Sequence, residues 1–239
     1  SDKDNYFSSN FGGTYFTFSN AKKIGRMREE IEIISDDDDE KCLLLTSLIY
    51  AVDKVANTVG HYDAYRRSLD SVSPIKMLMP DVYPQINYNN LVFKEDANQI
   101  IRKIECDILY LDPPYNSRQY SDSYHLLENL VDWKKPELFG IARKMDRSHI
   151  KSKYCLKNAR ETFEDLIINA RAKHILLSYN NTKNSKHSRS NARIHDNEIL
   201  EILEKKGKVK VFEKDFKAFT TGKTKDLSNK ERIFYCKVI

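Results

Sequence analysis

Apolar positions recur with helical spacing in the first third of the chain. Ser19 can cap a helix that runs to about Ile34, and a second helix is predicted for about residues 41–58. The apolar stripe of the second helix is the pattern of a core-facing surface. This stripe consists of Leu44, Leu48, Val52 and Val55. Residues 60–90 carry prolines at positions 74, 80 and 84 and predict an extended connection.

From residue 91 onward, short apolar runs alternate with helical patterns, which is typical of an open α/β sheet. The predicted helices cover residues 97–103, 121–131, 160–170 and 195–205. The predicted strands are one that ends at Leu111, then 174–179, 208–212 and 232–238. The last two strands are joined by a polar loop at 220–230, which suggests an antiparallel pair. The sequence therefore predicts a helical section at 1–90 and an α/β region at 91–239.

Composition narrows the class of protein only mildly. The 239 residues suffice for one large domain or for a domain with an inserted module, and the net charge is +5 with a pI near 8.8. The acidic run at 36–40 is interpreted as a solvated turn before the second helix, where carboxylates favour the helix amino end. A mildly basic chain is compatible with a nucleic-acid enzyme without establishing one.

Cysteine spacing and hydropathy predict neither a metal site nor a membrane anchor. The four cysteines at 42, 106, 155 and 236 show no Cys-x-x-Cys spacing, so neither zinc nor a disulfide framework is expected. No apolar stretch is long enough to span a membrane, and residues 1–10 lack the apolar core of a signal peptide. The reducing cytoplasm is the expected location.

The segment at 107–115, with the sequence DILYLDPPY, carries the strongest chemical signal. Its apolar residues suit a central strand, and Pro113 and Pro114 cannot continue a sheet, so the strand must stop there. In an open α/β sheet, ligands bind at the carboxyl ends of strands. Asp112 and Tyr115 are therefore predicted to stand at the mouth of a cleft.

These residue types suit the methylation of an exocyclic base amine. The nitrogen lone pair of such an amine is delocalised into the ring, so the amine is a poor nucleophile until acceptors hold its hydrogens. Asp112 and the Pro113 carbonyl supply two acceptors, whose hydrogen bonds strengthen as the nitrogen becomes tetrahedral. Tyr115 offers a flat face for an extruded base, and the prolines keep the turn rigid. The simpler alternative is a turn that merely ends a strand.

The chain resembles the amino-methyltransferases, and more narrowly the adenine-specific DNA methyltransferases of restriction-modification systems. Besides residues 112–115, the resemblance is carried by residues 10–16 (NFGGTYF), 93–97 (FKEDA), 116–120 (NSRQY) with 124–125, and 177–181 (LSYNN). It implies a Rossmann-like, S-adenosylmethionine-dependent fold with a closing antiparallel hairpin, plus a helical DNA-recognition module.

The resemblance also implies a cofactor-binding set of Asp96, Ala97 and Asp112, in which Asp96 hydrogen-bonds the adenine moiety of S-adenosylmethionine. The alternative for Asp96 is an acidic residue that starts a helix, and the two roles can coexist. The family normally adds a glycine-rich loop, but only Gly12 and Gly13 resemble one here, and no apolar strand precedes them. We therefore expect the loop to lie on a segment outside this sequence or on another polypeptide.

Candidate DNA contacts fall in three places. Arg118, Gln119 and Tyr120 follow the catalytic turn and would face an entering base, although Arg118 could instead cap a helix. Two basic stretches, 143–157 and 183–193, suit phosphate contacts, with solvated surface loops as the alternative. They contribute Lys151, Lys153, Lys186 and Arg189.

The sequence thus predicts transfer of a methyl group from S-adenosylmethionine to the N6 amine of a flipped adenine in double-stranded DNA. The alternatives are an RNA base methyltransferase, a cytosine-amine methyltransferase, and a DNA-binding specificity partner that lacks catalysis. Expected partners are duplex DNA, a cognate restriction endonuclease, and the segment or subunit that supplies the loop.

Overall fold

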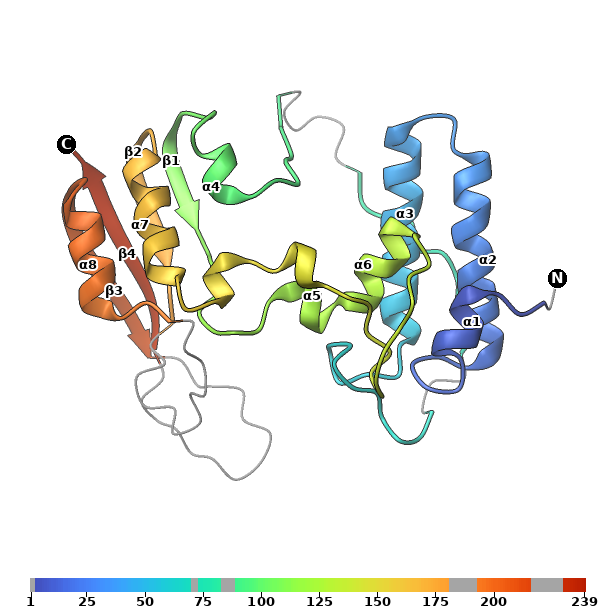
Figure 1. Ribbon diagram of the computed structural model, residues 1–239. Coiled ribbons are helices and arrows are strands. Elements are labelled where there is room, and N and C mark those ends of the chain that lie inside the picture. The colour runs from blue at the N-terminus through green and yellow to red at the C-terminus, as the bar shows by residue number, and fades with distance from the viewer. Residues whose placement is uncertain (1–2, 70–72, 83–88, 181–192, 216–229) are drawn as a thin grey trace. The chain divides into compact units, whose positions relative to one another are not determined.

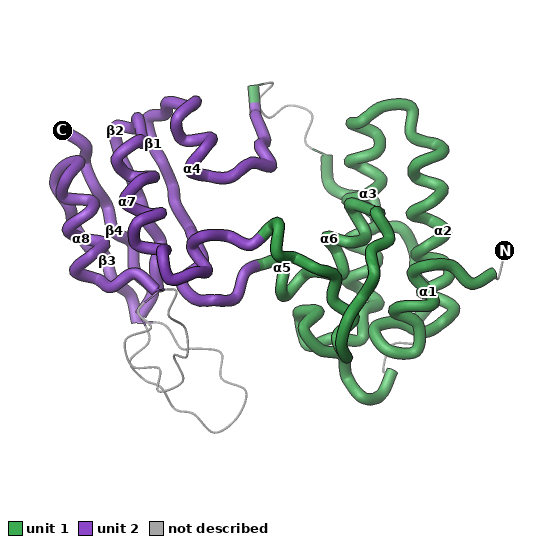
Figure 2. Tube along the Cα trace, viewed as in Figure 1, with its two compact units in different colours: residues 1–89, 120–150 green, residues 90–119, 151–239 purple. Residues whose placement is uncertain are grey.

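A computed structural model describes residues 3–69, 73–82, 89–180, 193–215 and 230–239 (Figure 1). The chain divides into two compact units, shown in Figure 2. The helical unit comprises residues 1–89 and 120–150, and the sheet unit comprises 90–119 and 151–239. The chain passes from the helical unit to the sheet unit between residues 89 and 90. Residues 120–150, however, group with the helical unit instead of the α/β region.

Helices α1 (Tyr6–Phe11), α2 (Phe18–Ile34) and α3 (Asp38–Val55) form most of the helical unit. The cap of α2 is Thr17, not Ser19, because the Thr17 hydroxyl accepts from the Asn20 backbone N–H at 3.2 Å. Helix α3 begins before residue 41, with Asp37 as its cap and three acidic residues in its first turn, where they suit the helix dipole. The predicted stripe of α3 packs in the core, where Leu48 and Val52 are fully buried.

The predicted helix at 121–131 is instead two helices, α5 (Tyr120–Ser123) and α6 (His125–Asp132). The break occurs because the Ser123 carbonyl accepts from the Tyr62 N–H at 2.7 Å and is not used by the next helical turn. The short helix η1 (Ser148–Ile150) follows later in the unit.

Buried Arg28 of α2 attaches α6 to the helical unit. Its guanidinium donates to the carbonyls of Leu130 and Val131 at 2.7 and 2.9 Å, which satisfies acceptors that a helix end leaves open. Leu126 and Leu130 pack in the same core as α1, α2 and α3. These contacts explain why residues 120–150 belong to this unit.

The sheet unit contains α4 (Ala97–Ile100), β1 (Cys106–Leu111), η2 (Lys153–Cys155), α7 (Ala159–Asn169), β2 (Ala172–Ser178), α8 (Asp196–Glu204), β3 (Gly207–Asp215) and β4 (Lys230–Val238). Its strand order is β1-β2-β4-β3. Strands β1 and β2 are parallel, whereas β4 runs antiparallel to both β2 and β3. The predicted α/β fold with a closing antiparallel hairpin is confirmed. The predicted loop at 220–230 lies almost wholly outside the described residues.

Helices α7 and α8 cover one face of this sheet (Figure 1). Phe163 of α7 and Ile199 of α8 pack against Leu109, Ile175 and the neighbouring strands. Residues that alternate with these point to the other face, where Ile108, Tyr110 and Phe212 are each more than half exposed. Among the described residues, β1 pairs with β2 alone, so it is an edge strand there.

The Gly12–Gly13 pair ends a helix and does not follow a strand. Gly12 caps α1 through its N–H to the Ser8 carbonyl, and Gly13 has a positive φ of 74°. A Cβ on either glycine would lie within 3.0 Å of the Phe18 ring. Close packing and turn geometry therefore account for this pair. No helix among the described residues is both long and apolar enough to cross a membrane.

Candidate active site

The segment Asp112 to Tyr115 leaves the carboxyl end of β1, next to the carboxyl end of the parallel strand β2. Asp112 is exposed, and its carboxylate has no hydrogen bond or ion pair with any described residue. Pro113 and Pro114 fix the backbone and end the strand. The turn therefore presents a free acceptor on a rigid support, in the position that the sequence predicted.

Tyr115 lies against the first residue after β2. Its ring meets that of Tyr179 edge to face, with centroids 6.3 Å apart at 80°, and it stays 38% exposed. Tyr179 is itself buried, and its hydroxyl accepts from the Ile194 N–H at 3.1 Å. Tyr115 is thus supported on one side and open on another.

A cavity of about 280 Å³ lies beside the turn, entirely within the sheet unit. Its lining is mainly apolar, and Asp112 is the one acidic or basic residue among the lining residues. The lining residues are Ala97, Tyr110, Leu111, Asp112, Pro113, Pro114, Ser152, Tyr154, Phe163 and Leu166. An apolar cavity with a few convergent polar groups is typical of small-molecule sites, and this one is slightly smaller than their usual range of about 300–1,000 Å³.

Asp96 caps α4, as the alternative interpretation of this residue expected. Its carboxylate accepts from the Asn98 backbone N–H at 3.0 Å, and its side chain is exposed. The next residue, Ala97, lines the cavity together with Asp112. The structure therefore brings two members of the predicted cofactor set to one cavity and places the third beside them.

Sequence reasoning missed a buried network behind this cavity. Asn98 donates to the Thr162 carbonyl at 2.8 Å and to Asp165 at 2.7 Å, and it accepts from the Tyr154 hydroxyl at 3.0 Å. Burial raises the pKa of Tyr154, and the charges of Asp96 and Asp165 raise it further. The sequence held one indication of this network, which is that Tyr154 is an aromatic residue among the lysines of residues 151–157.

Gln119 is buried, not surface-facing as its predicted role required. It is 6% exposed, and its amide oxygen accepts from the Ser152 N–H at 2.8 Å. The hydrogen bond to the Ser152 N–H holds the Gln119 side chain in the interior of the sheet unit. A lone polar residue after a turn gave no sign of a partner 33 positions away.

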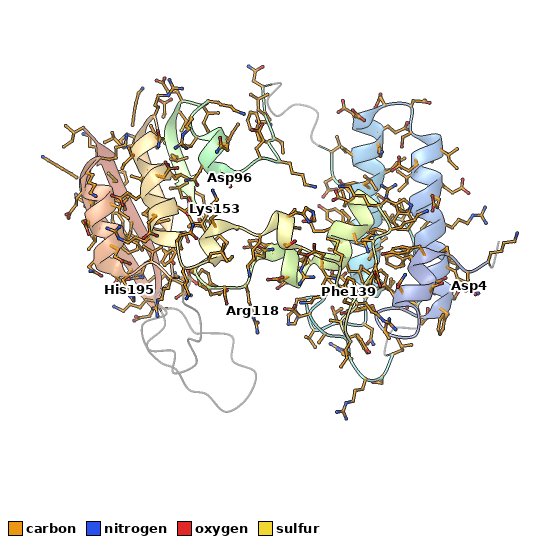
Figure 3. The ribbon with its side chains drawn as sticks, viewed as in Figure 1. Asp4, Asp96, Arg118, Phe139, Lys153 and His195 are labelled. Atoms are coloured by element: carbon orange, nitrogen blue, oxygen red, sulfur yellow. The ribbon has the colours of Figure 1, made fainter. Side chains whose placement is uncertain are left out.

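The other predicted DNA contacts that the structure describes are exposed. Arg118, Lys151 and Lys153 lie on the sheet unit (Figure 3 labels Arg118 and Lys153). The Arg118 backbone N–H donates to the Asn116 side chain at 2.8 Å, which belongs to a turn and not to a helix cap. Tyr120 is 70% exposed, belongs to the helical unit and stacks on Tyr124 at 6.2 Å. Lys186 and Arg189 lie outside the described residues.

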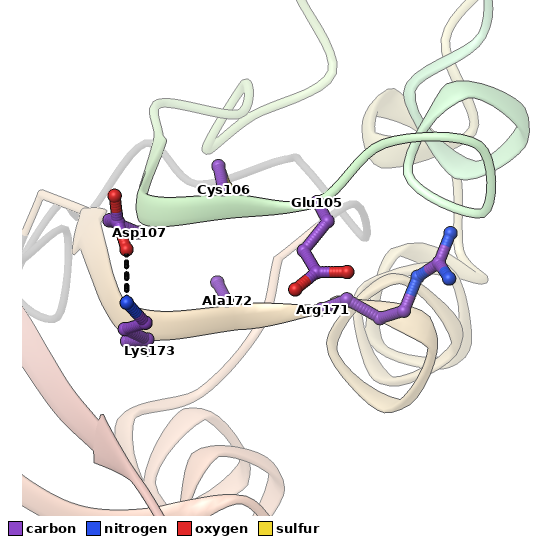
Figure 4. Close-up of a pocket in the computed structure, with 6 residues that line it drawn as sticks. All are labelled: Glu105, Cys106, Asp107, Arg171, Ala172 and Lys173. Carbon is purple, nitrogen blue, oxygen red and sulfur yellow. Dashed lines mark ion pairs between the residues drawn. The ribbon is translucent and has the colours of Figure 1, made fainter.

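A second hollow, of about 590 Å³, lies at the opposite end of β1 (Figure 4). It is lined by Glu105, Cys106, Asp107, Arg171, Ala172 and Lys173. Asp107 and Lys173 form an ion pair at 2.6 Å, and both side chains are more than three-quarters exposed. Ligands of α/β sheets bind at the carboxyl ends of strands, so this amino-end hollow is the weaker candidate.

Charge is divided unevenly between the two units. The sheet unit has 25 lysines and arginines against 16 acidic residues, whereas the helical unit has 15 against 19. The sheet unit is therefore strongly basic and the helical unit is acidic. Attraction to a polyanion resides mainly in the unit that carries the cavity.

A family model for D12 class N6 adenine-specific DNA methyltransferases matches residues 2–198. The chain belongs to this family. The predicted resemblance is thereby confirmed, and the Asp112 turn and its cavity lie within the matched region.

Curated relatives are modification methylases. The chain is 40% identical over 173 residues to modification methylase StsI from Streptococcus sanguinis, which covers 70% of this chain and 26% of the relative. It is 34% identical over 226 residues to Type II methyltransferase M.NlaIII from Neisseria lactamica, covering 90% of this chain and 63% of that protein. M.FokI from Planomicrobium okeanokoites is 37% identical over 172 residues, covering 69% and 26%. The chain thus spans between a quarter and two-thirds of these relatives. No solved structure matches it.

Proposed function

We propose that this chain carries the catalytic turn of an enzyme that transfers a methyl group from S-adenosylmethionine to the N6 amine of adenine in duplex DNA. The observation that carries the proposal is the free Asp112 carboxylate on a rigid turn beside an apolar cavity. Family membership supports the same chemistry. The named relatives are methylases of restriction-modification systems, which supports duplex DNA as the substrate.

In this proposal, Asp112 and the Pro113 carbonyl accept the two hydrogens of the adenine amine. S-adenosylmethionine, when bound, supplies a methyl group on a positively charged sulfur. Transfer would form a bond from the amine nitrogen to that methyl carbon and break the carbon–sulfur bond, whose electron pair would stay on sulfur. The proton that the methylated nitrogen releases would pass to Asp112. Asp112 holds the amine proton that becomes acidic in the transition state, so its hydrogen bond is stronger there than in the ground state.

The cavity fits part of the cofactor. Its apolar lining suits a flat ring, and Ala97 brings the Asp96 end of α4 to its edge. We assign adenine-moiety contacts to Asp96 and Ala97, and contacts near the reacting atoms to Asp112. A glycine-rich loop for the remainder of the cofactor is not recognisable in the sequence, and the Gly12–Gly13 pair serves a helix end.

We propose that further polypeptide, from a preceding segment or a second subunit, completes the sheet along β1. Parallel strands are normally covered on both faces, and an edge strand presents unpaired backbone groups to which another strand can bind. Ile108 and Tyr110 of β1 are 62% and 59% exposed, on the face that α7 and α8 do not cover. The greater length of the relatives supports this proposal.

For DNA, we assign phosphate contacts mainly to the sheet unit, through Arg118, Lys151, Lys153, Lys186 and Arg189. The charge of the sheet unit supports this assignment. Tyr115 is proposed to stack against the flipped base, because its ring is partly open and supported by Tyr179. The helical unit remains the proposed recognition module, although its acidic charge argues against a role as phosphate anchor. A cognate restriction endonuclease and a cytoplasmic location stay predictions.

The test is transfer of labelled methyl to mixed-sequence duplex DNA, followed by nucleoside analysis. Asp112→Asn is compared with Asp107→Asn, a matched change of an exposed aspartate at the other end of β1. The three proteins are compared in the form that transfers methyl groups, either this chain alone or the chain together with the polypeptide that covers β1. We expect methyladenine from the wild type and from Asp107→Asn, and a loss of at least roughly 100-fold from Asp112→Asn. Undiminished transfer by Asp112→Asn would refute the mechanism.

Other products distinguish the alternatives. Methylcytosine, or transfer to single-stranded RNA alone, would replace adenine in DNA as the substrate. If the chain binds DNA but transfers nothing, the assay is repeated with the full-length polypeptide or subunit that covers β1. Absence of transfer there too would leave a DNA-binding specificity partner as the function.

A further inference from the structure

One wall of the cavity is a short segment, residues 151–155, that is fixed at both ends by buried side chains. At one end, the Ser152 N–H donates to the Gln119 amide oxygen at 2.8 Å. At the other end, the Tyr154 hydroxyl donates to the Asn98 amide oxygen at 3.0 Å. Within the segment, the Tyr154 N–H donates to the Ser152 hydroxyl at 3.2 Å, which closes the η2 turn. We name residues 151–155 the strut.

The two anchor residues belong to different segments of the sheet unit. We name residues 112–119 the catalytic loop, and Gln119 is its last residue. Asn98 lies in α4, directly after Ala97. Ser152 and Tyr154 line the cavity together with Asp112 and Ala97. The strut therefore connects the catalytic loop to the helix that we assign to the cofactor.

The Asn98 end of the strut has one defined geometry. Both donor hydrogens of the Asn98 amide are used, toward the Thr162 carbonyl and Asp165, so the amide cannot turn without losing bonds. Arg102 holds Asp165 at 2.6 Å, and this hydrogen bond lowers the pKa of the Asp165 carboxyl, with the Asn98 bond as the next cause. A buried and fully bonded network of this kind specifies position as well as adding stability.

Packing against the cavity does not by itself explain why the residues that fix the strut are polar. A phenylalanine at position 154 would supply the same ring without burying a hydroxyl, and an aliphatic residue at 119 would fill the space of the glutamine. Burying these polar groups is unfavourable unless each finds its partner. Both do, and both partners belong to elements that border the cavity.

We propose that Asn98, Gln119 and Tyr154 are positioning residues that fix the catalytic loop relative to α4 and so set the affinity for the ligand of this cavity. This inference rests on the proposed function, because it names S-adenosylmethionine as that ligand. The three residues act through the backbone segments that they hold, and they are not assigned contact with the reacting atoms.

The first experiment compares Tyr154→Phe with Tyr235→Phe in methyl transfer and in hydrogen exchange. The Tyr154 hydroxyl lies 3.0 Å from the Asn98 amide oxygen and 3.5 Å from the Thr162 carbonyl oxygen. Tyr235 is the control because its hydroxyl is hydrogen-bonded too, to His174 at 2.9 Å, on the sheet face away from α7. We expect the KM for S-adenosylmethionine to rise roughly tenfold in Tyr154→Phe, the effect of one lost hydrogen bond, with kcat changing less. Tyr235→Phe should leave both constants unchanged.

Hydrogen exchange decides the inference independently of activity. In Tyr154→Phe, backbone amides of α4 and of residues 115–119 should exchange faster, although the substitution removes no bond to the catalytic loop. Gln119→Leu should produce the same two-sided effect from the other end. If exchange rises only inside residues 151–155, or the two tyrosine variants behave alike, the strut has no positioning role.

Failure of the proposed function gives a different result. In that case neither the wild type nor any variant would transfer methyl groups to adenine, even with β1 covered, while the exchange pattern would still show whether the strut couples its two ends. If methyl transfer is normal and exchange becomes faster at only one end of the strut, the positioning role of the strut is rejected and the proposed function stands.

Discussion

Buried His125 should make the stability of the helical unit fall as the solution becomes acidic. His125 is 1% exposed, and its Nε2 lies 2.8 Å from the Tyr62 carbonyl oxygen. Burial lowers the pKa of His125 from 6.5 to about 4, which outweighs the opposing effect of that carbonyl. Lys144 and Arg147 lower the pKa further, while Asp63 opposes them. The imidazole is therefore neutral in the folded unit at pH 7.

The sign of the effect follows from proton uptake. Because the folded pKa lies below the unfolded value, the unfolded chain binds the proton more tightly, so stability rises with pH across this range. The contribution of neutral His125 is fully present above about pH 6.5 and is lost as the pH falls toward 4. The folded and unfolded pKa values of His125 differ by about 2.5. This difference corresponds to a loss of roughly 3 kcal/mol in the free energy of unfolding between pH 6.5 and 4, at about 1.4 kcal/mol per pH unit.

The chain offers a specific optical signal for this measurement. Its single tryptophan, Trp133, ends α6 in the helical unit, so urea unfolding followed by tryptophan fluorescence reports on that unit. His125→Gln removes the titrating group and keeps a donor near the Tyr62 carbonyl. His149→Gln, an exposed histidine of the same unit, is the matched control.

We expect the wild type and His149→Gln to lose stability together between pH 6.5 and 4.5, with His125→Gln showing a slope smaller by up to about 1.4 kcal/mol per pH unit. Parallel curves for all three proteins would show that His125 does not titrate on unfolding in this window. That outcome would refute the argument from burial.

Two further predictions concern packing and the ion pair of a buried arginine. Leu48→Ala should destabilise the helical unit by about 2–5 kcal/mol, measured by the same fluorescence method. The Leu48 side chain is fully buried, and the surrounding core fills the space left by the removed atoms only in part. Asp196→Asn should destabilise the sheet unit by roughly 2–3 kcal/mol, because Arg232 is 4% exposed and would lose its carboxylate partner at 2.8 Å. The loss is smaller than for a fully buried pair because the Asp196 side chain is 34% exposed. Native-state hydrogen exchange of β4 measures this loss. Glu213→Gln, which removes the exposed pair with Lys230, should change exchange there little, and equal effects would contradict the burial argument.

Local patterns were sufficient for most elements and for the turn at residues 112–115. The run from Ile108 to Leu111 followed by two prolines predicts a strand that must stop, and Asp112 stands where that argument places it. Helix ends were less accurate, as with Thr17 in place of Ser19, because several neighbouring hydroxyl residues can cap and only the folded backbone selects one. The break at Tyr124 was not predictable, since it depends on the Tyr62 N–H, about 60 positions away.

The sequence alone determined the family, the α/β class with its closing hairpin, and the residues that could accept an amine, because each rests on neighbours within a few positions. Only the tertiary structure decided that residues 120–150 join the helical unit, and that Gln119 and Tyr154 form hydrogen bonds beside the cavity. Those features depend on hydrogen bonds and packing between residues 30 or more positions apart. A single sequence carries no periodic signal for such pairs, since folding alone brings them within bonding distance.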